Sequence, residues 1–151
     1  MKIITIGLIV FLLCISIASA SASEINDEKT LISAEDLGYT IVPGKADDAA
    51  IGTRAVTTTI TQGETNWHSK PVTSFTQSLK VDLNWGDSSD SLKLYVYDPS
   101  GNLVGTFYDS FDGTINGRTL VYINNDNGIE QGTWRFRVYG LSVSGTEDYS
   151  I

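Results

Sequence analysis

The stretch Gly86-Asp87-Ser88 has the residue types of a hydrolase nucleophile motif. A serine nucleophile needs a histidine base within hydrogen-bonding reach and an acid that orients this histidine. The one histidine, His68, lies upstream in a turn-rich segment, and Ser89 stands where a Gly-Asp-Ser-Leu hydrolase has leucine. Asp and Ser side chains also close turns on their own backbone. We therefore interpret this stretch as a structural turn, and we predict no catalytic residue and no enzymatic activity.

Oxygen-rich loops make calcium the candidate cation. The segment Asp112-x-Thr114-x-Asn116-Gly117 imitates the opening of an EF-hand loop, but position twelve is Ile123 instead of glutamate and no helices are predicted beside it. A single histidine without cysteines or well-placed carboxylates cannot make a zinc site. The hypothesis is a sandwich-type calcium site in a protein that requires no cofactor. Its candidate ligands are Asp109, Asp112 and Asn116, or the loop with Asp87 and Asp90.

Aromatic and basic side chains alternate with apolar ones in segments 92–97 and 134–139. If the apolar residues face the core, the side chains that face outward are Tyr95, Tyr97, Arg135, Arg137 and Tyr139. Such a face can stack on sugars or contact a protein partner. The alternative is ordinary cross-strand pairing of Tyr and Arg, or cover by the N-terminal leader. We expect alanine at Tyr95 and Tyr97 to weaken ligand binding without unfolding the domain, and we assign Trp85 and Trp134 to the core.

The elements that position these residues are short strands. From Ala55 onward, apolar and polar residues alternate with a period of two, and turn residues interrupt them roughly every 8 to 12 positions, as in a β-sandwich or barrel. No stretch of this region has a helical period. The predicted strands are 56–61, 79–85, 92–97, 103–108, 120–123, 134–139 and 149–151. Seven or eight antiparallel strands of this kind must pack as two layers to bury their apolar faces.

The N-terminal part has two predicted segments. Residues 1–22 have one lysine, an apolar run and a small-residue cleavage site, which indicate a secretory signal peptide. Residues 23–54 are charged and poor in aromatic side chains, so we expect a flexible leader or linker, with one capped turn at Ser33–Asp36. The β-domain is then 55–151. We expect a secreted or cell-surface protein with no stable membrane insertion after cleavage.

Composition narrows the function classes. The formal net charge is −8, and removal of the signal peptide with Lys2 makes it −9. It also removes Cys14, the only cysteine, so core packing must stabilise the exported domain. Nucleic acids and anionic membranes are bound by clusters of Lys and Arg, and the acidic balance argues against both. We expect a monomer, with metal cations and extracellular proteins or polysaccharides as the remaining partners.

The order of several segments resembles the bacterial and archaeal pre-peptidase C-terminal domain family over about residues 56–151. The segments are ITQGETNW (60–67), LKVDLNW (79–85), LKLYVYDPSGN (92–102), GTWRFRVYG (132–140) and GTEDYSI (145–151). The resemblance implies a jelly-roll-like β-sandwich that accompanies exported enzymes as a non-catalytic accessory or binding module. Whatever it assists is expected to be another chain or a surface. A structural cell-envelope component is the alternative function, and a small secreted hydrolase is a distant one.

Overall fold

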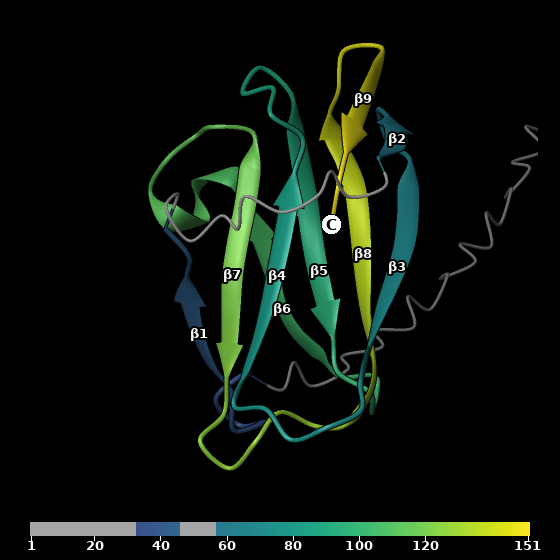
Figure 1. Ribbon diagram of the computed structural model, residues 1–151. Coiled ribbons are helices and arrows are strands. Elements are labelled where there is room, and N and C mark those ends of the chain that lie inside the picture. The colour runs from purple at the N-terminus through teal and green to yellow at the C-terminus, as the bar shows by residue number, and fades with distance from the viewer. Residues whose placement is uncertain (1–32, 46–56) are drawn as a thin grey trace, which may run out of the picture.

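The structure is a computed structural model that describes residues 33–45 and 57–151. The described residues form nine antiparallel strands and one short 3-10 helix, η2 (Asp109–Asp112), so the predicted all-β fold is confirmed (Figure 1). The strands are β1 (Thr40–Pro43), β2 (Thr58–Thr61), β3 (Thr65–Val72), β4 (Ser78–Asn84), β5 (Ser91–Tyr97), β6 (Leu103–Tyr108), β7 (Arg118–Asn124), β8 (Gly132–Ser142) and β9 (Thr146–Tyr149). The predicted signal peptide lies outside the described residues.

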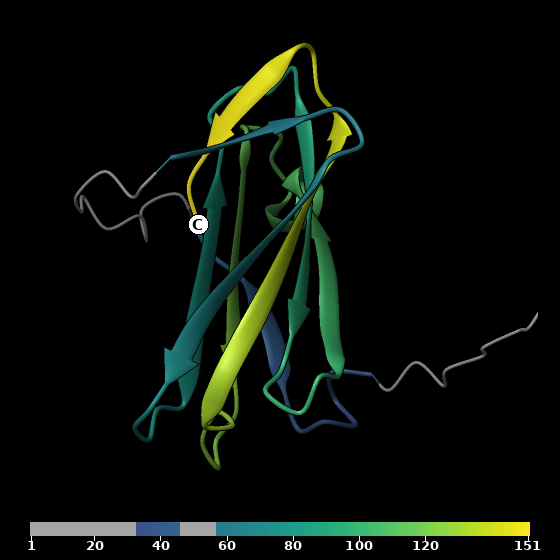
Figure 2. The ribbon, with the colours of Figure 1, turned by 90° about the vertical axis from the view of Figure 1, so that its right-hand side faces the viewer.

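The strands are arranged in two facing layers (Figures 1 and 2). One layer is a four-stranded sheet in the order β3-β8-β5-β6. The other contains the orders β1-β7-β4 and β2-β9, which the antiparallel bridge between Asn84 and Ser150 joins. Strands β2 to β9 therefore have the eight-stranded order of a jelly roll, β7-β4-β9-β2 facing β3-β8-β5-β6. This topology agrees with the jelly-roll-like sandwich that the family resemblance implied, and β1 is a ninth strand beyond the seven or eight expected.

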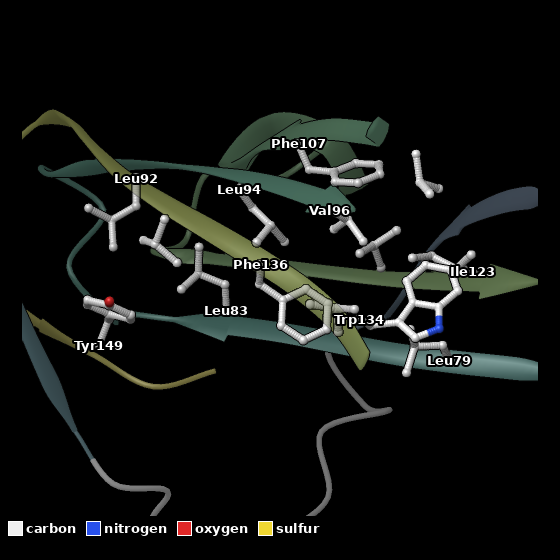
Figure 3. Close-up of a cluster of buried hydrophobic side chains, with 14 of the residues drawn as sticks. Leu79, Leu83, Leu92, Leu94, Val96, Phe107, Ile123, Trp134, Phe136 and Tyr149 are labelled. Atoms are coloured by element: carbon white, nitrogen blue, oxygen red, sulfur yellow. The ribbon is translucent and has the colours of Figure 1, made fainter. Parts of the chain in front are cut away.

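The core lies between the two layers and follows the predicted alternation. On β5, Leu92, Leu94 and Val96 are fully buried, and the residues between them are half-buried. On β8, Trp134, Phe136 and Val138 point into the same core, and β4 closes it from the opposite layer (Figure 3). Trp85 is also buried, so the core assignment of both tryptophans is confirmed.

The structure corrects the predicted leader over residues 33–45. The capped turn is present, because the Ser33 hydroxyl accepts from the Asp36 N–H and donates to the Asp36 carboxylate. The chain then forms β1, and all four residues of β1 pair with β7. Tyr39 is buried, and its ring packs edge-on against Trp134 with 5.5 Å between the centroids. These residues are part of the folded domain, whereas the remainder of the predicted leader, 23–32 and 46–54, is outside the described residues.

The segment predicted to be turn-rich around His68 is also a strand. Strand β3 pairs with β8 from Thr65 opposite Tyr139 to Val72 opposite Gly132. It is one of the two edge strands of the four-stranded sheet, a position in which Pro71 is tolerated because an edge strand has unpaired backbone groups. Most of its side chains are exposed, so its sequence lacks the apolar alternation that identified β4 and β5.

Candidate functional site

The predicted aromatic and basic residues lie together on the solvent side of the four-stranded sheet. In the register of β5 and β8, Tyr95 is opposite Arg137, and Tyr97 is opposite Arg135. Residues directly opposite each other share a face of the sheet. Since the alternate positions on both strands are buried, this set points away from the core. We define the outer face by its residues Trp67, Lys93, Tyr95, Tyr97, Tyr108, Arg135, Arg137 and Tyr139.

Trp67 is the most exposed aromatic residue of this outer face and was not predicted to belong to it. It lies on β3, opposite Arg137, and 55% of it is accessible to solvent. Its ring is 5.5 Å from the Tyr97 ring, measured between centroids, at an interplanar angle of 39°. The two other tryptophans, Trp85 and Trp134, are buried. No direction could be predicted for Trp67 because its segment was not recognised as a strand.

Cations on the outer face are held against aromatic rings. The Arg137 guanidinium carbon is 3.7 Å from the Tyr95 ring centroid. The Lys93 ammonium is 4.7 Å from the Tyr95 centroid and 5.1 Å from that of Tyr108. Hydrogen bonding to Tyr95, and then to Tyr108, raises the pKa of Lys93 above its usual value. Each cation–π contact contributes about 0.5–1 kcal/mol at an exposed site, so these side chains are partly ordered before any ligand arrives.

A second group consists of the carboxylates of Asp87, Asp90 and Glu147. In the part of the chain that the structure describes, it is the one group of at least three His, Cys, Asp or Glu residues whose ligand atoms lie within 4.8 Å of one another. Asp90 is buried and accepts the Ser144 N–H at 3.0 Å. Carboxylate oxygens are the ligands that Ca²⁺ prefers, so these three residues could hold a cation. Glu147 was not predicted, because it comes from β9, far along the chain from Asp90.

The loop candidates Asp109 and Asp112 have other partners. Asp109 is buried, and its carboxylate accepts backbone N–H groups from Asn116 at 3.1 Å, Gly117 at 3.0 Å and Arg118 at 3.2 Å. Asp112 accepts the N–H and the hydroxyl of Thr114. Both carboxylates therefore close the loop on its own backbone, which is a structural task that the sequence alone did not separate from metal binding.

The electrostatic environment of Glu147 makes its ionisation unfavourable. Burial, followed by the hydrogen bond to Asp90 and the charges of Asp90 and Asp87, raises the pKa of Glu147 to about 7. Its usual value is 4.5. Like charges disfavour ionisation of a nearby carboxyl, and a bound divalent cation would offset that repulsion.

This pKa predicts a pH-dependent stability. The folded protein holds the Glu147 proton up to a higher pH than the unfolded chain, so the free energy of unfolding should fall as pH rises from about 4.5 through 7. We expect Glu147→Gln to lack this contribution, so the variant gains stability relative to the parent as the pH rises. Urea unfolding of both proteins at pH 4, 6 and 8 with a chelator present measures the difference.

The same unfolding measurement at pH 8, with millimolar calcium in place of the chelator, tests the calcium hypothesis. Millimolar calcium should stabilise the parent protein at pH 8 more than Glu147→Gln if the three carboxylates bind the ion. Asp126→Asn, which removes an exposed loop carboxylate elsewhere, is the matched control. Parallel pH profiles for parent and Glu147→Gln would show that the carboxyl is not perturbed. Equal stability of the parent with calcium and with chelator would reject the ion at this place.

A hydroxyl-rich hollow of about 300 Å³ has one residue of each group in its lining. Its lining includes Tyr108 of the outer face and the buried Asp90. The remaining lining residues include the serines Ser88, Ser89, Ser91, Ser110 and Ser142. The hollow therefore borders both the outer face, at Tyr108, and the carboxylate group, at Asp90.

The stretch Gly86–Ser89 is a turn, as predicted. The Asp87 carboxylate accepts the N–H and the hydroxyl of Ser89 at 2.8 and 2.7 Å. His68, which the sequence placed in a turn-rich segment, is instead half-buried on β3. Its Nε2 lies 2.7 Å from the Tyr149 hydroxyl, and burial lowers its pKa. The partner of the imidazole is therefore a core tyrosine.

Comparison with known proteins relates the chain to an archaeal protein. The chain matches no family model. Over 52 residues it is 44% identical to an uncharacterized protein of Archaeoglobus fulgidus, a match that covers 34% of this chain and 72% of the archaeal protein. The chain therefore belongs to the same family as this archaeal protein, which is described only as uncharacterized. Within residues 33–45 and 57–151, no helix has the length and apolar character needed to cross a membrane.

Proposed function

We propose that the protein is a secreted, non-catalytic binding module that holds an extracellular polymer on its outer face. The jelly-roll sandwich is consistent with the resemblance to pre-peptidase C-terminal domains, which accompany exported enzymes. The proposed export rests on the apolar N-terminal segment. In this proposal, the four-stranded sheet positions the binding residues. The polymer bound there is kept close to an exported enzyme or to the cell surface.

The exposed pair of Trp67 and Tyr97 is the observation that carries the proposal. An aromatic ring buries 150–250 Å² when covered, so leaving Trp67 more than half exposed forgoes a favourable contribution to folding. Groups of large, exposed aromatic side chains are found at binding surfaces more often than on the rest of a protein surface. Exposed aromatic rings on one face of a sheet can stack on the flat, apolar faces of sugar rings in a polysaccharide.

Removal of the Trp67 ring should abolish most binding without unfolding the domain. We expect Trp67→Ala to weaken polymer binding by about ten-fold or more, the size of a typical hot-spot residue. Co-sedimentation with insoluble cellulose, chitin, pectate and collagen, with the fold monitored by thermal melting, measures both properties. Tyr97→Ala should weaken the same interaction less, because Tyr97 is half-buried.

Phe75→Ala is the matched control, because Phe75 is 67% exposed but lies in the loop between β3 and β4. It should bind as the parent does. Equal binding by the parent and Trp67→Ala would refute the outer face as the binding surface. A dimer that dissociates in Trp67→Ala, together with no polymer binding, would assign this face to a second copy of the chain.

A further inference from the structure

The four-stranded sheet differs in charge from the rest of the molecule. Strands β3, β5, β6 and β8 contain no Asp or Glu, although the chain has 18 of them. Their outward positions include Lys93, Arg135 and Arg137. The carboxylates that the structure groups together, Asp87, Asp90 and Glu147, lie outside these four strands. A locally cationic surface on an acidic protein attracts anions to one place and repels them elsewhere.

We infer that the polymer held on the outer face is an anionic polysaccharide, of the kind that carries a carboxylate on its sugar rings. The inference rests on the proposed function and names its ligand class. Neutral glycans would use the aromatic rings but offer the three cations no anion to bind. Carboxylates distributed along a polysaccharide would use both.

The spacing of the two arginines on β8 allows them to bind carboxylates that repeat along a polymer. Arg135 and Arg137 are two residues apart on β8, which places their backbones about 7 Å apart along the strand. Guanidinium groups bind carboxylates through paired, charge-assisted hydrogen bonds. The Arg137 Nε is buried and has no hydrogen-bond acceptor in the described structure, and the guanidinium carbon lies 3.7 Å from the Tyr95 ring centroid. Buried donors are nearly always satisfied, so Nε would gain an acceptor if the Arg137 side chain shifts as a carboxylate binds beside Tyr95.

Pairs of polymers that share a sugar backbone and differ in charge distinguish binding of the carboxylates from binding of the sugar rings. Affinity electrophoresis in gels containing carboxymethyl cellulose or hydroxyethyl cellulose compares one backbone with and without carboxylates. Pectate and fully methyl-esterified pectin form a second pair. We expect retardation by each anionic polymer at least ten-fold stronger, as an apparent binding constant, than by its neutral partner. Added sodium chloride should reduce this preference, because salt screens exposed charges.

Arg135→Gln is the sharpest variant, since Arg135 is exposed and removal of its charge leaves the core untouched. We expect about ten-fold weaker binding to the anionic polymers, the size of one charge-assisted hydrogen-bonded pair, and no change with the neutral ones. Lys45→Gln removes the same charge outside the outer face and should bind like the parent. Arg137→Lys keeps the charge and removes the planar donor fork, so it should bind more weakly than the parent.

The outcomes distinguish this inference from the proposed function. Equal retardation by charged and neutral partners that depends on Trp67 would overturn the preference for anions and leave the outer face as the binding surface. Retardation by anionic polymers that is insensitive to Arg135→Gln and to Trp67→Ala would overturn both. No retardation by any of the anionic polymers would overturn the inference, and the Trp67→Ala co-sedimentation would then decide the proposed function alone.

Discussion

Asp109→Ala is expected to lower the free energy of unfolding by about 3–5 kcal/mol, with calcium or with a chelator present. Asp109 is 5% exposed, and its carboxylate accepts three backbone N–H groups from residues 116–118. A buried donor left without an acceptor costs about 1–3 kcal/mol. The damage should extend to the neighbouring turn, because the Gly117 carbonyl accepts the N–H groups of Trp85 and Gly86.

Asp112→Ala is the control for this result. Asp112 belongs to the same loop, but the hydrogen bonds that its carboxylate accepts come from the exposed Thr114, and its charge also acts on Arg118. We expect a smaller loss, of about 1 kcal/mol, because the two hydrogen bonds from Thr114 are local and exposed to solvent. Urea unfolding in both solutions measures the two variants. If Asp109→Ala destabilises the protein only when calcium is present, Asp109 is a metal ligand and the loop-closing role is wrong.

Tyr39→Ala should cost about 3–4 kcal/mol, the loss typical of a large aromatic side chain removed from a core. Tyr39 is 4% exposed and packs against Trp134, and its burial raises its pKa to about 12. A truncated chain that begins at Thr57 would lose β1 as well and expose the edge of β7, so a larger loss of stability is expected.

Val42→Ala is the control for Tyr39→Ala, because it removes an exposed side chain from the same segment and keeps the backbone pairing of β1. Val42 lies on β1 but is 40% exposed, so we expect a loss of less than about 1 kcal/mol, typical of surface substitutions. Thermal and urea unfolding of Tyr39→Ala, Val42→Ala and the truncated chain provide the comparison. Unchanged stability in Tyr39→Ala would restore residues 33–45 to a leader outside the domain.

The strands that the sequence predicted well are those with one buried face. Strands β5 and β8 alternate between core and surface, and this alternation made both their existence and their orientation readable. Strand β1 is four residues long, and β3 is an edge strand whose polar side chains are largely exposed. Neither strand shows a clear alternation of apolar and polar residues in its sequence, because few of its side chains are buried. Backbone pairing with the neighbouring strand holds each of them in the sheet.

The residues of the candidate site could be predicted where their strands were recognised, and were missed elsewhere. Tyr95 and Arg137 were placed together because their strands were recognised, whereas Trp67 was missed together with β3. Glu147 joins Asp90 through tertiary pairing that no local pattern reports. Asp109 illustrates a different limit, since a loop aspartate looks the same in sequence whether it binds calcium or its own backbone.

Trp67 provides the most direct test of the outer face as a polysaccharide-binding surface. It is the exposed one of the three tryptophans, so quenching of tryptophan fluorescence by acrylamide reports mainly on its ring. Titration of the parent protein with polygalacturonate should protect this fluorescence from quenching, and Trp67→Phe should lose the protected signal. Saturable binding of polygalacturonate with unchanged quenching would place the ligand elsewhere and contradict the account.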